Sequence, residues 1–169
     1  HCRCPYHGDD EASSWGAAAV TTASAAGKAI LLGEHAVVYG RRAIACPLPL
    51  TMRAHVEDVE KGVQLLIPSW GVEYELAKPP EQRRSFERAA GAILDELGLA
   101  SRGIRIEVFP DVPRAMGLGG SAALAVAIIR ALDKHFKLGL DNNEVNRLAY
   151  VSERIAHGPL PATLERWDR

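Results

Sequence analysis

Apolar residues in the first half of the chain come in short segments between Lys28 and Leu76. The segments are KAILL, AVVY, AIACPLPL, TMRAHVEDV, VQLLI and VEYEL. Apolar segments of this length, bounded by turn residues, are typical of β-strands. The residues that separate them include Gly33, Gly40, Gly62 and Gly71. The pattern therefore predicts hairpins and a largely antiparallel sheet.

In the second half of the chain the apolar period changes to that of helices. Residues 86–97 carry apolar side chains at helical spacing, which predicts an amphipathic helix. Residues 103–109, GIRIEVF, alternate and predict a strand. A second helix is predicted over 121–136, and it is apolar on nearly all sides, so we expect it in the core. Asp141 and Glu144 form a start like a capping box for a third helix.

These elements occupy residues 25–158, which we predict to form one domain. Strands followed by helices, without regular βαβ alternation, predict an α+β fold. With 169 residues, 47% of them hydrophobic, the chain can bury one sizeable core. Residues 1–24 are small and polar without a period, and we predict a disordered tail there. We predict that residues 159–169 form a C-terminal tail.

Charge and cysteine content narrow the classes of partner. A net charge of −1 provides no positive field, so we expect neither a nucleic-acid nor a membrane partner. The longest apolar run, 122–129, is too short to cross a bilayer, and no signal peptide opens the chain. The odd cysteine count favours a reducing compartment, so we expect a cytoplasmic protein. We interpret the terminal cluster as tail rather than metal site, because it lacks a separated second ligand pair: His1, Cys2, Cys4 and His7.

The sequence PRAMGLGGSAA, residues 113–123, leads into the predicted buried helix. Glycines let a ligand approach the backbone closely. The unpaired amides and the positive dipole end of a helix N-terminus favour an anion such as phosphate. Ser121 adds a hydroxyl oxygen that could ligate the Mg²⁺ accompanying a nucleotide. The alternative interpretation is a flexible turn, glycine-rich so that it packs tightly before a buried helix.

Two well-known phosphate loops do not fit this stretch. A Walker loop requires a lysine directly before the position of Ser121, and Gly120 stands there. The dinucleotide pattern GxGxxA matches Gly117, Gly119 and Ala122 by letter. However, the preceding predicted strand ends several residues earlier, and no strand with a terminal acid follows the helix.

Charged residues elsewhere in the chain could complete such a site. Lys28 stands in AGKAILLGEHAVVYG, where a predicted strand is followed by a turn containing Glu34 and His35. Lys28 could supply the positive charge that the loop lacks, or it could be a solvated residue at a strand end beside an ordinary hairpin. Glu153 lies beside the apolar stripe of the third helix, where an acid should be paired or liganded. It could form a salt bridge with an arginine, or complete an oxygen-rich Mg²⁺ site with Ser121.

Taken together, AGKAILLGEHAVVYG and PRAMGLGGSAA resemble the GHMP kinases, and SERIAHG, residues 152–158, is similar to the helix that supplies the metal-binding acid in that family. The resemblance covers roughly residues 25–158. It implies the family's α+β N-terminal domain, of the ribosomal protein S5 domain 2-like type, without the C-terminal ferredoxin-like domain. It implies ATP-dependent phosphorylation of a small alcohol, mevalonate or a similar one, in isoprenoid precursor biosynthesis. Phosphomevalonate is the alternative substrate, and the full-length family member would be a homodimer.

The resemblance also implies a role for each matching residue. Lys28 would be a catalytic residue that stabilises charge near the transferred phosphoryl group, and Glu34 and His35 would line the substrate side. Ser121 and Glu153 would hold Mg²⁺. The ATP phosphates would be cradled by Pro113, Gly117, Leu118, Gly119, Gly120, Ser121 and Ala122.

Two departures from the family pattern stand out. The loop is usually GLGSS, whereas Gly120 replaces the first serine here. After Gly158 the family continues with a Pro-Ser-Gly segment and a catalytic aspartate near the position of Leu164, but this chain continues as PLPATLERWDR. The sequence around Asp168 does not resemble the family's segment, so Asp168 is not assigned that role. We therefore expect an incomplete or inactive form, ended by a frameshift or truncation, or alternatively a non-catalytic ATP-binding fragment.

Overall fold

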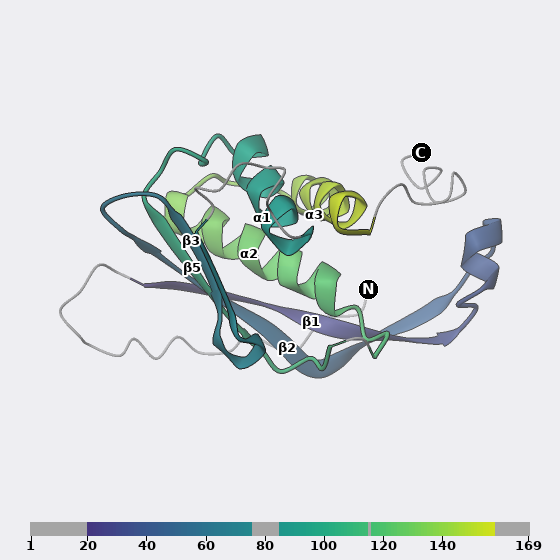
Figure 1. The fold of residues 1–169 in the computed structure, drawn as a ribbon. Helices are drawn as coiled ribbons and strands as arrows, with labels where there is room; N and C mark the ends of the chain where they lie inside the picture. Colours follow the sequence, from purple (N-terminus) through teal and green to yellow (C-terminus); the bar gives the residue numbers. More distant parts are fainter. Residues whose placement is uncertain (1–19, 76–84, 115, 158–169) are drawn as a thin grey trace.

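The computed structural model describes residues 20–75, 85–114 and 116–157. Its elements combine one sheet with three helices and two short 3₁₀ helices (Figure 1), so the α+β class is confirmed. The strands are β1 (Thr21–Leu32), β2 (Ile44–Asp58), β3 (Val63–Ile67), β4 (Val72–Glu75) and β5 (Ile104–Pro110). The helices are α1 (Ser85–Glu96), α2 (Gly120–Phe136) and α3 (Asn142–His157), and the 3₁₀ helices are η1 (Ala36–Tyr39) and η2 (Pro68–Trp70).

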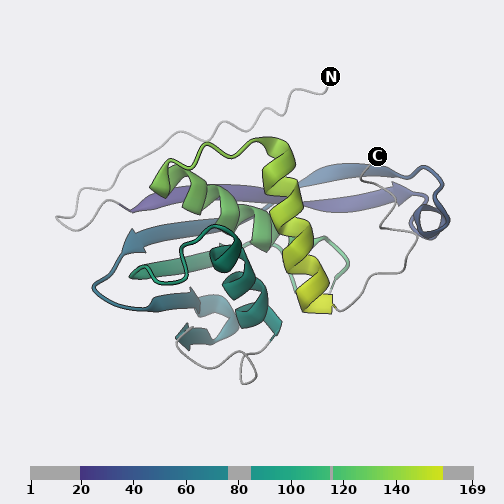
Figure 2. The same ribbon diagram turned by 90° about the horizontal axis from the view of Figure 1, so that it is seen from above.

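The five strands lie in the order β1-β2-β5-β3-β4. Neighbouring strands are antiparallel except for β3 and β5, which run parallel. All three helices cover one face of this sheet (Figure 2). Helix α2 packs on β1 and β2, while α1 and α3 pack against each other. One face of the sheet thus carries the core, and none of the described helices covers the other.

The core forms where alternate residues of the strands meet α2. Over residues 52–56 of β2 and 104–108 of β5 every second side chain is fully buried, as at Met52, Val56, Ile104 and Ile106. Helix α2 buries apolar residues on most of its circumference, from Ala123 to Leu132. Each fully buried Leu or Ile contributes about 1.5 to 3 kcal/mol relative to an exposed one. The predicted buried helix is confirmed, and this packing holds the start of α2 in place.

The third helix begins as its sequence indicates. The backbone N–H of Glu144 donates a hydrogen bond to Asp141 Oδ1 at 2.8 Å. That bond satisfies one of the helix's unpaired N-terminal donors. The apolar face of α3 buries Val145, Leu148 and Ala149.

Three predictions about the first 60 residues are wrong. The prediction of a disordered tail over 1–24 fails at residues 21–24, because β1 begins at Thr21 and its first residues pair with β2. Residues 1–19, with the possible metal cluster, lie outside the described residues, as do 158–169. The segment AVVY is the 3₁₀ helix η1, not a strand. The segments AIACPLPL and TMRAHVEDV join in the single strand β2.

The β1–β2 hairpin reaches beyond the helices (Figures 1 and 2), and η1 lies at its end. Gly33 follows β1 with a φ of 87°, and a Cβ there would stand 2.7 Å from the carbonyl oxygen of Arg42. Only glycine fits this turn without a shift of the backbone. The hairpin end also exposes large apolar side chains, among them Leu32 and Tyr39.

Gly103 lies just before β5, and we expect its substitution to lower the stability of the protein. A Cβ at this position would overlap the carbonyl oxygen of Val59, whose N–H donates to the carbonyl of Gly103 at 3.0 Å. We expect Gly103→Ala to lower the free energy of unfolding by about 1 to 3 kcal/mol, because packed backbone must move. Urea denaturation would measure it. Gly120→Ala is the control, because a Cβ there makes only ordinary contacts, 3.5 Å or longer; equal stability of both variants would contradict the prediction.

His55 lies on the face of the sheet away from the core. We expect it to lower the stability of the protein at acid pH. Its ring lies 4.9 Å from that of Phe109. Burial lowers the pKa of His55. The negative charge of Glu107 raises this pKa, whereas the positive charge of Arg53 lowers it further, and the net shift is downward. The unfolded chain therefore binds the proton more tightly, so stability falls as pH drops below about 6.5 toward the folded-state pKa. Urea midpoints at about pH 5 and pH 7.5 should differ less in His55→Gln than in the unchanged chain. His35→Gln, at an exposed position, should leave that difference unchanged.

Candidate functional site

A cleft of about 530 Å³ opens beside the N-terminus of α2. Its walls include Lys28, Pro113, residues 117–122 and Glu153. These residues come from β1, from the loop before α2, from the first turn of α2 and from α3. The cleft therefore gathers the predicted phosphate loop, the predicted cation and the predicted metal ligands in one place.

The glycine loop takes a backbone conformation that suits glycine. Gly117 and Gly119 have φ values of 70° and 69°, in the left-handed region. Gly119 caps α2, and its carbonyl accepts the first helical bond, from the N–H of Ala123, at 3.0 Å. The first N–H groups of a helix have no partner within the helix. The cleft wall therefore carries the positive end of a core helix, a setting that favours an anion.

Lys28 is fastened to this loop by two hydrogen bonds. Its backbone N–H donates to the carbonyl of Leu118 at 2.9 Å, and its ammonium group donates to the carbonyl of Gly117 at 3.3 Å. The loop is also close to the lysine stem, because a Cβ on Gly119 would lie 2.8 Å from Lys28 Cγ. The structure thus brings a cation from the strand β1 to the glycine loop.

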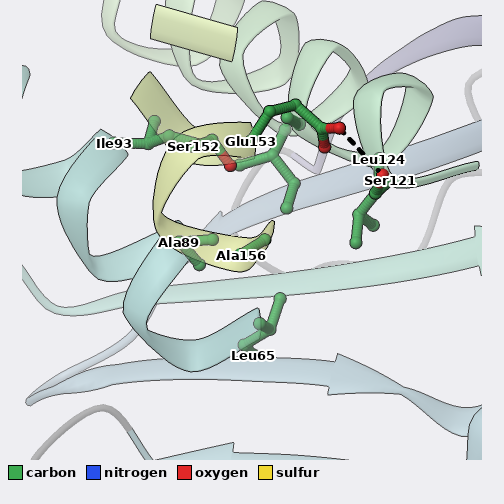
Figure 3. Close-up of a pocket in the computed structure, with 11 residues that line it drawn as sticks. Leu65, Ala89, Ile93, Ser121, Leu124, Ser152, Glu153 and Ala156 are labelled. Carbon is green, nitrogen blue, oxygen red and sulfur yellow. Dashed lines mark hydrogen bonds between the residues drawn. The ribbon is translucent and has the colours of Figure 1, made fainter. Parts of the chain in front are cut away.

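Ser121 and Glu153 face each other across α2 and α3 (Figure 3). The Ser121 hydroxyl donates a hydrogen bond to Glu153 Oε2 at 3.1 Å. Both side chains also line a small cavity of about 20 Å³, whose other walls are mostly apolar, including Ile93 and Leu124. Electrostatic interactions are stronger beside such an apolar wall than in open water.

The Ser121–Glu153 pair fits a Mg²⁺ ion. Mg²⁺ prefers oxygen ligands at about 2.1 Å in octahedral geometry, so neighbouring ligands lie about 3 Å apart. The two oxygens here are 3.1 Å apart. In the described part of the chain no three His, Cys, Asp or Glu side chains gather. A Mg²⁺ ion here would thus need further oxygens from a ligand or water, as is usual for this ion beside phosphates.

Glu34 and His35 lie apart from this cleft. Both are exposed in the turn that follows β1, at the hairpin end. The described residues that line the cleft do not include them. Their assignment to the substrate side stays a prediction.

Sequence reasoning missed four residues of the cleft wall, Met52, Trp70, Arg114 and Met116. Trp70 ends η2, between β3 and β4, and Arg114 precedes the glycine loop. The Arg114 guanidinium carbon lies 4.8 Å from the centroid of a Trp70 ring. The charge of Arg114 within PRAMG was a usable signal. Trp70 had none, because its segment meets the loop only in the folded chain.

Residues 84–162 match the family model for the N-terminal domain of GHMP kinases. The fold, the glycine loop at the start of α2 and this match agree: the chain belongs to the GHMP kinase family. The predicted family is therefore confirmed.

Individual relatives point in a narrower direction. The mevalonate kinase of Methanothermobacter thermautotrophicus is 39% identical over 123 residues, covering 68% of this chain and 36% of that protein. The mevalonate kinase of Thermococcus gammatolerans is 32% identical over 151 residues, covering 80% of this chain and 45% of the relative. The chain thus spans less than half the length of these curated relatives.

Solved structures share the fold. The crystal structure of the Methanococcus jannaschii mevalonate kinase superposes with a TM-score of 0.70 at 27% identity, over 85% of this chain and 48% of that one. The Lactococcus lactis galactokinase complexed with galactose gives a TM-score of 0.67 at 23% identity, over 83% of this chain and 39% of the galactokinase. At that identity the galactokinase shows the fold alone.

Proposed function

We propose that the cleft binds ATP with Mg²⁺, and that this chain is the ATP-binding part of a kinase that phosphorylates mevalonate. One observation carries the proposal. Lys28, the glycine loop and the Ser121–Glu153 pair, from three separate segments, line a single cleft. The family membership of the chain supports the use of ATP.

Phosphoryl transfer needs mainly positioning and neutralisation of charge. The amides at the start of α2 would hold the phosphate oxygens, and Lys28 would stabilise the charge of the group that is transferred. Ser121 and Glu153 would hold Mg²⁺, which, when bound, neutralises charge on the phosphate oxygens. The hydrogen bond from Lys28 to Gly117 would keep the ammonium group beside the phosphates.

Mevalonate as the alcohol rests on the names of the relatives, several of which are mevalonate kinases at 30 to 39% identity. We keep phosphomevalonate as the alternative substrate. Within the described residues no helix is long and apolar enough to cross a membrane. The cytoplasmic location and the homodimer remain predictions.

A second candidate function is nucleotide binding without turnover by this chain. Among the described residues that line the cleft, Glu153 is the only acid, and it already faces Ser121. No second carboxylate of that set is available to take the proton of an attacking alcohol. This observation favours a binding module whose chemistry needs groups from elsewhere.

Calorimetry with the full chain would test the proposal. We expect ATP to bind in the presence of Mg²⁺ and to bind much more weakly in EDTA. ADP release would then be followed with ATP plus mevalonate, ATP plus phosphomevalonate, and ATP alone. Absence of any Mg²⁺-dependent ATP binding would refute the nucleotide site. Binding without alcohol-dependent ADP release would favour the second candidate, and release with one alcohol only would identify the substrate.

A further inference from the structure

Arg114 is an exposed cation on the wall of the cleft, and its charge has no acidic partner in the described structure. The acid closest to it in the sequence is Asp111. Asp111 accepts a hydrogen bond from Thr51 at 3.2 Å and pairs with Arg53 at 3.7 Å. None of the ion pairs found among residues 20–75, 85–114 and 116–157 includes Arg114.

Trp70 holds the guanidinium group over the cleft instead. The two side chains come from separate segments of the cleft wall, and the guanidinium carbon lies 4.8 Å from a ring centroid, within the range of a cation–π interaction. The turn that carries Trp70 is well defined. Gly71 closes it in a left-handed conformation, and its N–H donates to the carbonyl of Pro68 at 3.0 Å. Arg114 thus packs on the ring of Trp70 beside the glycine loop.

The net charge of the cleft wall depends on Arg114. The described lining carries three charged side chains, namely Lys28, Arg114 and Glu153. The charges of Lys28 and Glu153 cancel, so Arg114 makes the wall net positive. A nucleoside triphosphate remains anionic after it binds one Mg²⁺, and a cleft of opposite sign attracts it.

We propose that Arg114 is an additional phosphate-binding residue, which rests on Trp70 in the empty cleft and moves to the phosphates when a nucleotide binds. The inference rests on the proposed nucleotide site and adds a residue to it. An exposed cation–π contact is weaker than a charge-assisted, bidentate bond from arginine to phosphate. The ligand can therefore displace Arg114 from the ring of Trp70, and the surroundings of the ring then change.

Fluorescence of Trp70 can report this movement. The chain has three tryptophans, and the other two, Trp15 and Trp167, lie outside the described residues. In a Trp15→Phe/Trp167→Phe background, Trp70 is the only tryptophan. We expect saturating Mg-ATP to change its emission, and Arg114→Gln to abolish most of that change. Mg-ATP affinity should fall by about tenfold or more in Arg114→Gln, the value of one charge-assisted bond.

Three comparisons make the test specific. Adenosine, which carries no phosphate, should bind Arg114→Gln and the unchanged chain alike. Arg114→Lys should bind Mg-ATP with intermediate affinity, because lysine keeps the charge but loses the bidentate geometry. Arg102→Gln, an exposed arginine outside the cleft, should leave affinity and emission unchanged. Circular dichroism would show that each variant remains folded.

The outcomes separate this inference from the proposed function. If the unchanged chain binds Mg-ATP and Arg114→Gln binds it equally well, Arg114 is not a phosphate-binding residue, although the nucleotide site stands. If Arg114→Gln loses affinity for adenosine as much as for Mg-ATP, the role is structural and the inference fails. If the unchanged chain binds no nucleotide, the proposed function and the inference both fail.

Discussion

Among single glycine-to-alanine substitutions in the glycine loop before α2, Gly119→Ala should reduce Mg-ATP affinity the most. A residue with a Cβ at its φ of 69° costs about 1 to 2 kcal/mol. The added Cβ would also lie 2.8 Å from Lys28 Cγ, so the lysine would have to leave its place. We expect Mg-ATP affinity to fall by about tenfold or more, since one charge-assisted interaction is lost. Calorimetry and urea denaturation would measure both effects.

Gly117→Ala provides the matched control for this variant. Gly117 has a φ of 70°, so a Cβ there causes the same backbone strain as at Gly119. However, this Cβ would meet nothing within 4 Å. Both variants should lose similar stability from backbone strain, whereas only Gly119→Ala displaces Lys28. Equal losses of nucleotide affinity would show that the position of Lys28 does not matter for binding.

Glu153→Gln should remove most of the effect of Mg²⁺ on nucleotide binding. The substitution keeps the shape of the side chain but removes the charge that attracts the ion. Mutation of groups that only support metal ligands already costs about 10- to 100-fold in metal affinity. We therefore expect Mg-ATP affinity to fall at least about tenfold, toward the value measured in EDTA. Ser121→Ala should act in the same direction, because it removes the other oxygen of the pair.

Glu144→Gln is the matched control on the same helix. Glu144 is an exposed acid in the first turn of α3, 3.8 Å from Arg147. Its neutralisation should leave the Mg²⁺ dependence unchanged. If Glu153→Gln keeps the full response to Mg²⁺ and a normal thermal transition, the Ser121–Glu153 pair is not the metal site.

Local pattern predicted the helices well and the strands less well. The apolar periods of α1 and α2 and the Asp141 cap of α3 report preferences of adjacent residues, so they could be read directly. The two prolines of AIACPLPL made β2 look like separate segments. In the structure Pro47 and Pro49 lie in the part of β2 that pairs only with β1, where one side of the strand is unpaired and proline is tolerated.

At the hairpin end, sequence proximity does not show which residues line the cleft. Glu34 and His35 follow Lys28 closely in the chain, yet they are not among the described residues that line the cleft, and their assignment to the substrate side stays a prediction. Strand β1 continues past Lys28 for four residues, to Leu32, and rises about 3.3 Å per residue. The two side chains are therefore carried away from the cleft, and sequence spacing could not show the direction.

The sequence by itself determined the glycine loop, the buried helix behind it and the identity of the family, because these depend on residues that are neighbours in the chain. Only the tertiary structure decided that Lys28 bonds to the loop, that Ser121 faces Glu153 and that Arg114 rests on Trp70. Each of these pairs joins segments far apart in the sequence. Periodicity shows which face of a helix or strand is buried, but not which faces meet, and that depends on the packing of the whole core.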